Sequence, residues 1–228
     1  MILHENDNHL GYGSRVIELQ NISVRHGTID ALRSVSAVIY PGRVTALAGR
    51  NGSGKSTLLG VIAGTQAHTG TVSGTTGARI AFVVQRSAVT AALPLTVRDV
   101  VTMGAWGRRG RWRPLTRDDR DAVTASIHAL GLDGLERRRF HDLSGGQRQR
   151  TLVAQGLAQR GDVLLLDEPT VGLDAEARQM IERAIESETG RGTTVLHATH
   201  DAGVIRSAAS VIRLDAGELR GGVMPERR

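Results

Sequence analysis

Gly49-Arg-Asn-Gly-Ser-Gly-Lys55-Ser56 is the stretch that decides the fold. It fits the pattern G-x-x-x-x-G-K-[ST] at every fixed position. Glycines let backbone N–H groups converge on phosphate oxygens, and the positive end of a following helix also favours an anion. The apolar segment Val44–Ala48 before the loop predicts a strand, and Lys55–Ala63 after it has helical spacing. Strand, glycine loop and helix together predict a binding site for nucleotide phosphates.

Two side chains of this loop have specific expected roles. Lys55 is placed to neutralise the β- and γ-phosphates of ATP, and the Ser56 hydroxyl is placed to bind Mg²⁺. The pattern alone leaves kinases, GTPases, helicases and transport ATPases open as classes. The nucleotide-binding residues that it predicts are Gly49, Arg50, Asn51, Gly52, Ser53, Gly54, Lys55, Ser56 and Thr57.

A second apolar segment, Val163–Leu166, is followed by the carboxylates Asp167 and Glu168. A buried strand would deliver Asp167 to its tip, where it can bind Mg²⁺ together with Ser56. Glu168 projects differently, so it can polarise the attacking water. Alone this is a weak pattern, because many strands end in solvated acids. Downstream of a phosphate loop it favours nucleotide hydrolysis, with Glu168 as a catalytic residue.

The remaining segments predict an α/β fold with a mostly parallel sheet, because strands and helices alternate. Short strands near the start predict an N-terminal antiparallel β part. Between about residues 86 and 142 the spacing is helical, which predicts an inserted α-helical subdomain. The further strands expected are Val16–Leu19, Ile22–Val24, Val35–Ile39, Ile80–Val84, Thr194–His197 and Val211–Leu214, and the inserted helices are Thr96–Met103 and Arg117–Leu130.

Composition narrows the class of protein further. The 228 residues include no cysteine, which excludes a disulfide scaffold, a thiolate zinc site and a cysteine nucleophile. The formal net charge is +6, but Lys55 is the only lysine among an excess of arginines, so we expect no nucleic-acid partner. Met1–Arg15 lacks the pattern of a signal peptide and predicts a disordered tail. No apolar run approaches the roughly 20 residues that span a bilayer, so another chain would supply any membrane span.

Leu143-Ser-Gly-Gly-Gln147 resembles the signature motif of ABC ATPases. Ser144 and the backbone amides of Gly145 and Gly146 can bind a γ-phosphate at the start of the helix that follows. By itself this stretch also fits an ordinary helix N-cap. Because Lys55 already holds one face of the nucleotide, the second anion site is expected to serve the nucleotide of a second protomer. The resemblance therefore implies a homodimer that forms when ATP binds.

The resemblance extends from about residue 16 to residue 221 and implies a RecA-like core, with tails at 1–15 and 222–228. It implies that Gln85 contacts Mg²⁺ and the water, and that His200 contacts the γ-phosphate. Asp174 matches the loop that crosses the dimer interface. His26 stands where these ATPases usually carry an aromatic residue that stacks on adenine, and an imidazole offers less stacking area than a phenol ring.

The stretch after Gln85 resembles the zinc and manganese uptake branch of ABC ATPases. Thr96-Val-Arg-Asp-Val-Val-Thr-Met-Gly104 and the basic segment Trp106–Arg113 carry this likeness, although Val84 stands where that branch has proline. We expect the basic segment to be a solvated turn near lipid head groups or a partner contact. Zinc is the favoured cargo and manganese the next. Haem and siderophore importers share much of the layout, so haem or iron-chelate uptake is the alternative.

This resemblance implies a peripheral protein at the cytoplasmic face of a bacterial membrane. Its partners would be integral membrane permease subunits and, indirectly, an extracellular substrate-binding protein that selects the cargo. ABC ATPases of DNA repair and chromosome organisation need long coiled coils or zinc modules, and those of translation usually carry two ATPase domains. The sequence has neither feature. A phosphate-loop kinase of another family is disfavoured by Leu143–Gln147.

Overall fold

The central sheet is mostly parallel, and its strands end close to the phosphate loop. The computed structural model describes residues 15–84, 94–109, 114–221 and 224–225. Neighbours β8 and β3, β3 and β7, β7 and β6, and β6 and β5 run parallel, whereas β9 and β10 pair antiparallel with β8. The order is β10 (Met224–Pro225), β8 (Ser210–Asp215), β3 (Val44–Ala48), β7 (Thr194–Thr199), β6 (Val163–Asp167) and β5 (Ile80–Val83), with β9 (Glu218–Leu219) beside β8.

A second, antiparallel sheet has the order β2 (Ile29–Ile39), β1 (Ile17–His26) and β4 (Thr69–Ser73). The two short strands predicted between residues 16 and 24 are one strand, β1, whose pairing shifts between Leu19 and Ile22. Asn21 lies at this irregularity with φ 52°, a conformation that Asn adopts more readily than most residues. The strand β4 was not predicted, because Thr-Gly-Thr-Val-Ser has too few apolar side chains to suggest a strand.

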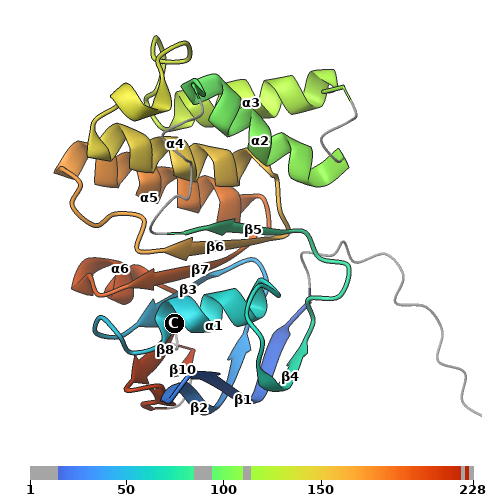
Figure 1. The fold of residues 1–228 in the computed structure, drawn as a ribbon, viewed down its shortest axis with the longest axis vertical. Helices are drawn as coiled ribbons and strands as arrows, with labels where there is room; N and C mark the ends of the chain where they lie inside the picture. The colour runs from blue at the N-terminus through green and yellow to red at the C-terminus, as the bar shows by residue number, and fades with distance from the viewer. Residues whose placement is uncertain (1–14, 85–93, 110–113, 222–223, 226–228) are drawn as a thin grey trace, which may run out of the picture.

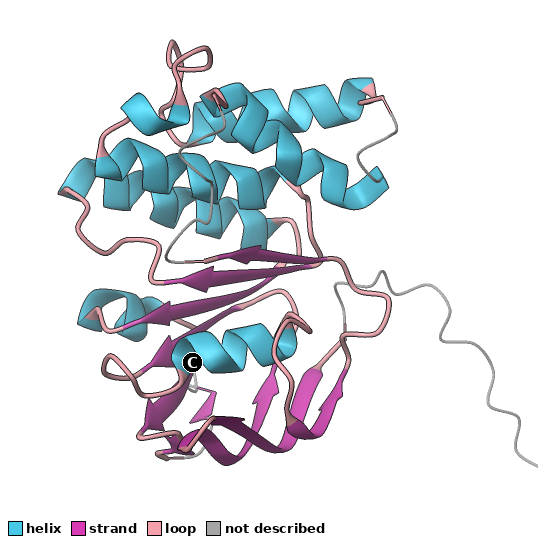
Figure 2. Cartoon of the chain, viewed as in Figure 1, coloured by secondary structure: helices cyan, strands magenta, loops and turns pink. Residues whose placement is uncertain are grey.

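Helices cover both faces of the parallel sheet (Figures 1 and 2). On one face lie α2 (Val97–Arg109), α3 (Arg117–Ala129), α4 (Gly145–Ala158) and α5 (Ala175–Gly190); α1 (Lys55–Ile62) lies between the sheet and the antiparallel strands on the other. Two apolar clusters correspond to these two faces. A short helix α6 (Ala202–Ser207) follows β7, and a single 3₁₀ turn, η2 (Phe140–Asp142), precedes α4. The α/β class with a mostly parallel sheet is therefore confirmed.

The helix α2 is longer than predicted. It was expected to end at Met103, with a turn over Trp106–Arg113, but it continues to Arg109. The turn prediction is wrong for Trp106–Arg109, where the helix continues through Gly107 to two arginines, which are good helix formers; residues 110–113 lie outside the described ranges. None of the helices in those ranges is both long and apolar enough to cross a membrane.

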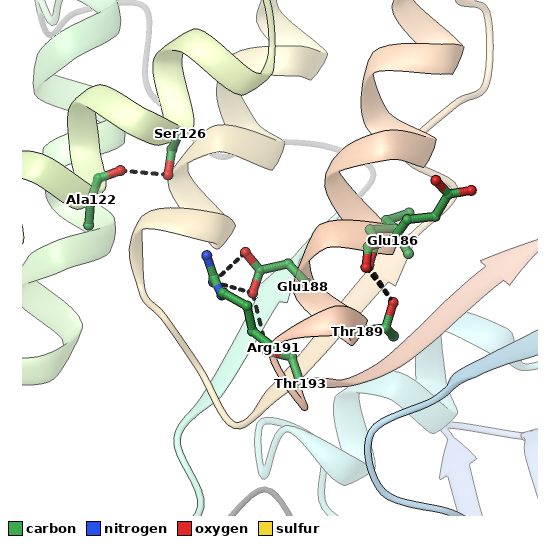
Figure 3. Close-up of polar contacts among 8 residues, drawn as sticks. Ala122, Ser126, Glu186, Glu188, Thr189, Arg191 and Thr193 are labelled. Atoms are coloured by element: carbon green, nitrogen blue, oxygen red, sulfur yellow. Dashed lines mark hydrogen bonds and ion pairs between the residues drawn. The ribbon is translucent and has the colours of Figure 1, made fainter.

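Polar side chains fix the turn between α5 and the central strand β7 (Figure 3). Glu188 is buried and accepts hydrogen bonds from the Arg191 guanidinium at 2.6 Å and from the Thr193 hydroxyl at 3.2 Å. The Thr189 hydroxyl donates to the Glu186 carbonyl at 2.9 Å. They hold the Glu188 carboxylate in place, and the carbonyls of Ser187, Glu188 and Thr189 at the helix end accept the backbone N–H groups of residues 191–193. They set the start of β7, the strand that leads to His200.

Candidate nucleotide-binding site

A cleft of about 620 Å³ opens over the N-terminus of α1. Part of its wall comes from β2, part from the turn between β8 and β9, and part from Glu168 at the end of β6. The remaining wall is the glycine loop that the sequence singles out. The loop residues that line the cleft are Asn51, Gly52, Gly54, Lys55, Ser56 and Thr57.

The loop requires glycine at position 54. Gly54 has φ 102° and is followed at once by the first residue of α1, Lys55. A Cβ at position 54 would lie 2.7 Å from the Ala31 carbonyl oxygen and 2.7 Å from Leu32 Cδ2. Any side chain would therefore collide with β2 and favour another backbone conformation. The first residues of α1, Lys55, Ser56 and Thr57, line the cleft, and the N-terminus of a helix stabilises an anion.

Lys55 is almost fully buried beneath the loop, with 5% of its side chain exposed. Its ammonium donates hydrogen bonds to the carbonyl oxygens of Gly49 at 2.8 Å and Arg50 at 3.1 Å. It also forms an ion pair with Glu168, with 3.1 Å between Nζ and Oε1. An ammonium has three donors, so all three are directed at partners in this structure.

Glu168 is the residue on which the charges of the site converge. Its other carboxylate oxygen, Oε2, lies 3.4 Å from Nδ1 of His200. Its backbone has φ 47°, and its N–H donates to the Ala198 carbonyl at 3.0 Å. A positive φ is uncommon for Glu, and here it turns the chain sharply at the end of β6. The structure thus brings together Lys55, Glu168 and His200 from three separate segments.

Asp167 precedes this turn and faces a different environment. It is buried, and within the described ranges its Oδ1 has no hydrogen-bond partner. Burial raises the pKa of Asp167, and the charge of Glu168 adds to the rise. A hydrogen bond from Ser56 and the charge of Lys55 oppose it. A buried carboxylate oxygen without a partner is costly, and a cation would satisfy it.

The loop that carries His200 is held by the residue after it. Asp201 caps α6, and its Oδ1 accepts the N–H of Gly203 at 2.6 Å and that of Val204 at 3.3 Å. These two bonds hold the pKa of the Asp201 carboxyl below its ordinary value, with a smaller contribution from Arg178. His200 itself is exposed toward solvent apart from its contact with Glu168.

Leu143–Gln147 and Asp174 lie at helix starts, and none of them is among the residues that line the described cleft. The Ser144 hydroxyl accepts from the Gln147 N–H at 3.2 Å, and the Gln147 side chain accepts the Ser144 N–H at 3.0 Å. This capping box starts α4. Asp174 caps α5 in a similar way, accepting the Ala177 N–H at 2.8 Å.

Of the two further predicted residues, one does not line this cleft and the other is not described. His26 is exposed at the turn between β1 and β2 and is not among the residues that line the cleft; Ile29, its partner across the turn, lines it and is 70% exposed. Gln85 lies outside the described residues. Ala216 and Gly217 also line the cleft; the sequence does not predict them, because a two-residue turn far along the chain carries no phosphate-binding pattern.

The fold and the cleft define an ATP-binding domain of the phosphate-loop class. The family model described as "ABC transporter" matches residues 32–171. The chain is 33% identical over 192 residues to the manganese transport system ATP-binding protein MntB of Halalkalibacterium halodurans, covering 82% of this chain and 77% of the relative. It is 38% identical over 196 residues to the zinc import ATP-binding protein ZnuC of a Jannaschia species, covering 85% and 76%.

A third relative is the chelated iron transport system membrane protein YfeB of Yersinia pestis, 36% identical over 197 residues, with 82% of this chain and 67% of that protein covered. Among solved structures, the dimeric ABC transporter cassette MJ0796 matches with a TM-score of 0.81 and 27% identity, covering 93% of this chain and 99% of that one. The same cassette with ADP and phosphate gives a TM-score of 0.79 and 26% identity, covering 93% and 99%. The chain belongs to the ABC transporter family and is an ATPase of that family.

Proposed function

We propose that this chain hydrolyses ATP to drive the import of a metal ion, with Lys55, Glu168 and His200 as the central residues. The observation that carries this proposal is the convergence of these three side chains: Lys55 and Glu168 line the glycine-loop cleft, and His200 contacts Glu168. Lys55 binds the β- and γ-phosphates, exchanging the Glu168 carboxylate for phosphate oxygens. Glu168, freed from Lys55, accepts a proton from the attacking water. His200 contacts the γ-phosphate and keeps Glu168 oriented.

The residues beside Lys55 fit a Mg²⁺ ion. Mg²⁺ prefers oxygen ligands. Asp167 ends β6 with an Oδ1 that has no hydrogen-bond partner within the described ranges, and Ser56, at the start of α1, is close enough to lower the pKa of Asp167. Gln85 would join them by its family position. When bound, the ion neutralises negative charge on the phosphates. Asp167 and Ser56 would hold it.

The start of α4 supplies the second half of each site from a partner protomer. Ser144 uses an acceptor lone pair in its capping box, so its hydroxyl hydrogen stays available to an anion. The N–H groups of Gly145 and Gly146 belong to the first helical turn, where no intrahelical partner exists. A Cβ would be unobstructed at Gly145, which supports an open approach for phosphate. Asp174 would lie near the same interface.

A mixing experiment tests the shared site. In a mixture of Lys55→Ala and Ser144→Arg chains, each inactive alone, the heterodimer has one site with both defects and one with neither. We expect each heterodimer to recover at most about half of the wild-type activity, and a random equal mixture, in which about half of the dimers are heterodimers, at most about a quarter. A mixture of Lys55→Ala with Asp167→Asn serves as the matched control, because those defects both lie on the nucleotide side and leave no intact site. Failure of the first mixture, with both chains folded, would contradict the two-fold arrangement.

The proposed cargo is zinc, with manganese second, delivered through separate permease subunits and an extracellular binding protein. The names of two relatives, a zinc and a manganese system, support this assignment. The chelated-iron relative supports the alternative. Uptake of radioactive zinc, manganese and iron should be compared in cells lacking this gene, restored with the wild-type chain or with Lys55→Ala. Zinc uptake that needs the wild-type chain supports the proposal, whereas loss of iron uptake alone would favour the alternative.

A further inference from the structure

The turn between β8 and β9 lies against the glycine loop although it is more than 150 residues further along the chain. Leu214 pairs with Leu219 and Asp215 with Glu218, so Ala216 and Gly217 form a two-residue turn. Their φ angles are 49° and 81°, and positive φ at both positions defines the turn type best suited to a tight hairpin. In Figure 1, β8 and β2 lie below α1.

The peptide groups of Gly217 bridge two walls of the cleft. The Gly217 N–H donates to the Ser53 carbonyl of the glycine loop at 3.1 Å, and the Gly217 carbonyl accepts the Arg33 N–H of β2 at 2.8 Å. The preceding strand also approaches the loop, since a Cβ on Gly49 would lie 2.4 Å from the Leu214 carbonyl oxygen. The hairpin is therefore in backbone contact with the loop at both of these places.

Only glycine permits this approach at position 217. A Cβ there would lie 2.8 Å from the Ala31 carbonyl oxygen and 3.2 Å from the Ala31 carbonyl carbon. Both are backbone atoms of β2, which cannot rotate away as a side chain can. A side chain at 217 would thus separate the turn from β2 and from Ser53 together. Gly54, whose own Cβ would meet the same Ala31 oxygen at 2.7 Å, would feel that movement.

We propose that Gly217 is a positioning residue for ATP: its turn sets the height of Ser53 and Gly54, and thereby the direction of the N–H groups that bind phosphate. This rests on the phosphate-loop assignment proposed above. Displacing the loop weakens phosphate contacts in the ground state and in the transition state alike, so KM should rise while kcat is retained. Because Gly217 acts through Ser53, this pattern separates it from the residues that perform the reaction.

Gly217→Ala tests the proposal against Gly192→Ala, a matched control. Gly192 has φ 88°, and a Cβ added there would meet no heavy atom within 4 Å, so its substitution carries the backbone penalty without the collision. We expect Gly217→Ala to raise the KM for ATP and the Kd for a fluorescent ADP analogue about tenfold, with kcat changed less than about twofold. Gly192→Ala should change neither. A wild-type KM and Kd in a folded Gly217→Ala chain would overturn the proposal.

Three further measurements keep the test decisive. Gly217→Asn carries the same Cβ with a smaller backbone penalty, because Asn tolerates positive φ. If the alanine variant does not fold, the KM of Gly217→Asn for ATP tests the proposal in its place, and it should rise in the same way. In the wild-type chain, ADP should slow hydrogen exchange of the amides at 216–219 and leave the exchange rate of the Gly192 amide unchanged. If ADP changes the exchange rates at 216–219 no more than the rate at Gly192, the proposal is contradicted. Lys55→Ala tests the phosphate-loop assignment separately from the role of Gly217. If this variant still binds the ADP analogue with wild-type affinity, the phosphate-loop assignment fails as well.

Discussion

Acidification should destabilise the folded chain through one buried histidine, His197. It lies in the middle of β7, is 1% exposed, and its Nε2 has no hydrogen-bond partner within the described ranges. Its neighbours across the sheet are Ala46 of β3 and Leu166 of β6. Burial lowers the pKa of His197 to about 4, and the charge of Asp201 acts weakly in the opposite direction.

The expected loss of stability follows from the two pKa values. The unfolded chain takes up this proton near pH 6.5, the ordinary value, whereas the folded chain takes it up only near pH 4. The unfolded state therefore binds more protons in this range, and the free energy of unfolding falls as the pH drops below 6.5. Linkage gives a loss of about 2 kcal/mol at pH 5 and about 3 kcal/mol at pH 4.

Urea denaturation at pH 7.5 and pH 5.0 measures this loss. His197→Leu keeps a similar volume and removes the titrating group, so its unfolding free energy should fall by about 2 kcal/mol less than that of the wild type between the two pH values. His68→Gln is the control, because His68 is exposed and its replacement should leave the wild-type fall intact. Equal falls in the wild type and in His197→Leu would refute the reasoning.

Three further outcomes are expected. Glu168→Gln should bind ATP but lose at least about a hundredfold in kcat, measured by phosphate release beside nucleotide binding; unchanged turnover would remove Glu168 from the reaction. An amine-selective reagent should modify Lys55, the only lysine, more slowly than the amino terminus, and Mg-ATP should protect both Lys55 and activity; full Lys55 modification without loss of hydrolysis would argue against its role. Ala216→Asn should raise the free energy of unfolding by about 0.5–1 kcal/mol, because Asn tolerates the φ of 49° better than Ala, and a lower melting temperature would count against that turn geometry.

The sequence predicted the parts of the fold that are coded by adjacent residues. Val44–Ala48 has the predicted bounds, because a short apolar run before a glycine loop leaves few alternatives. The strand β4 was missed, since its pairing with β1 supplies the stability that its own side chains do not. The contact of Gly217 with Ser53 joins residues far apart in the chain, and no local pattern encodes it. Position 217 requires glycine because β2 packs against the turn, and this packing is visible only in the folded structure.

The arrangement around Lys55 gives its buried side chain a counter-charge before ATP arrives. An isolated charge in such a place would be strongly disfavoured, and here Glu168 compensates it at 3.1 Å. Under the proposed mechanism, phosphate replaces the carboxylate on Lys55, so one anion is exchanged for another and the ammonium is never left unpaired. The same exchange releases Glu168 only when substrate is present. In that mechanism the carboxylate proposed to activate water is held on the lysine until there is a phosphate to attack, and His200, 3.4 Å from its second oxygen, would keep it at the site afterwards.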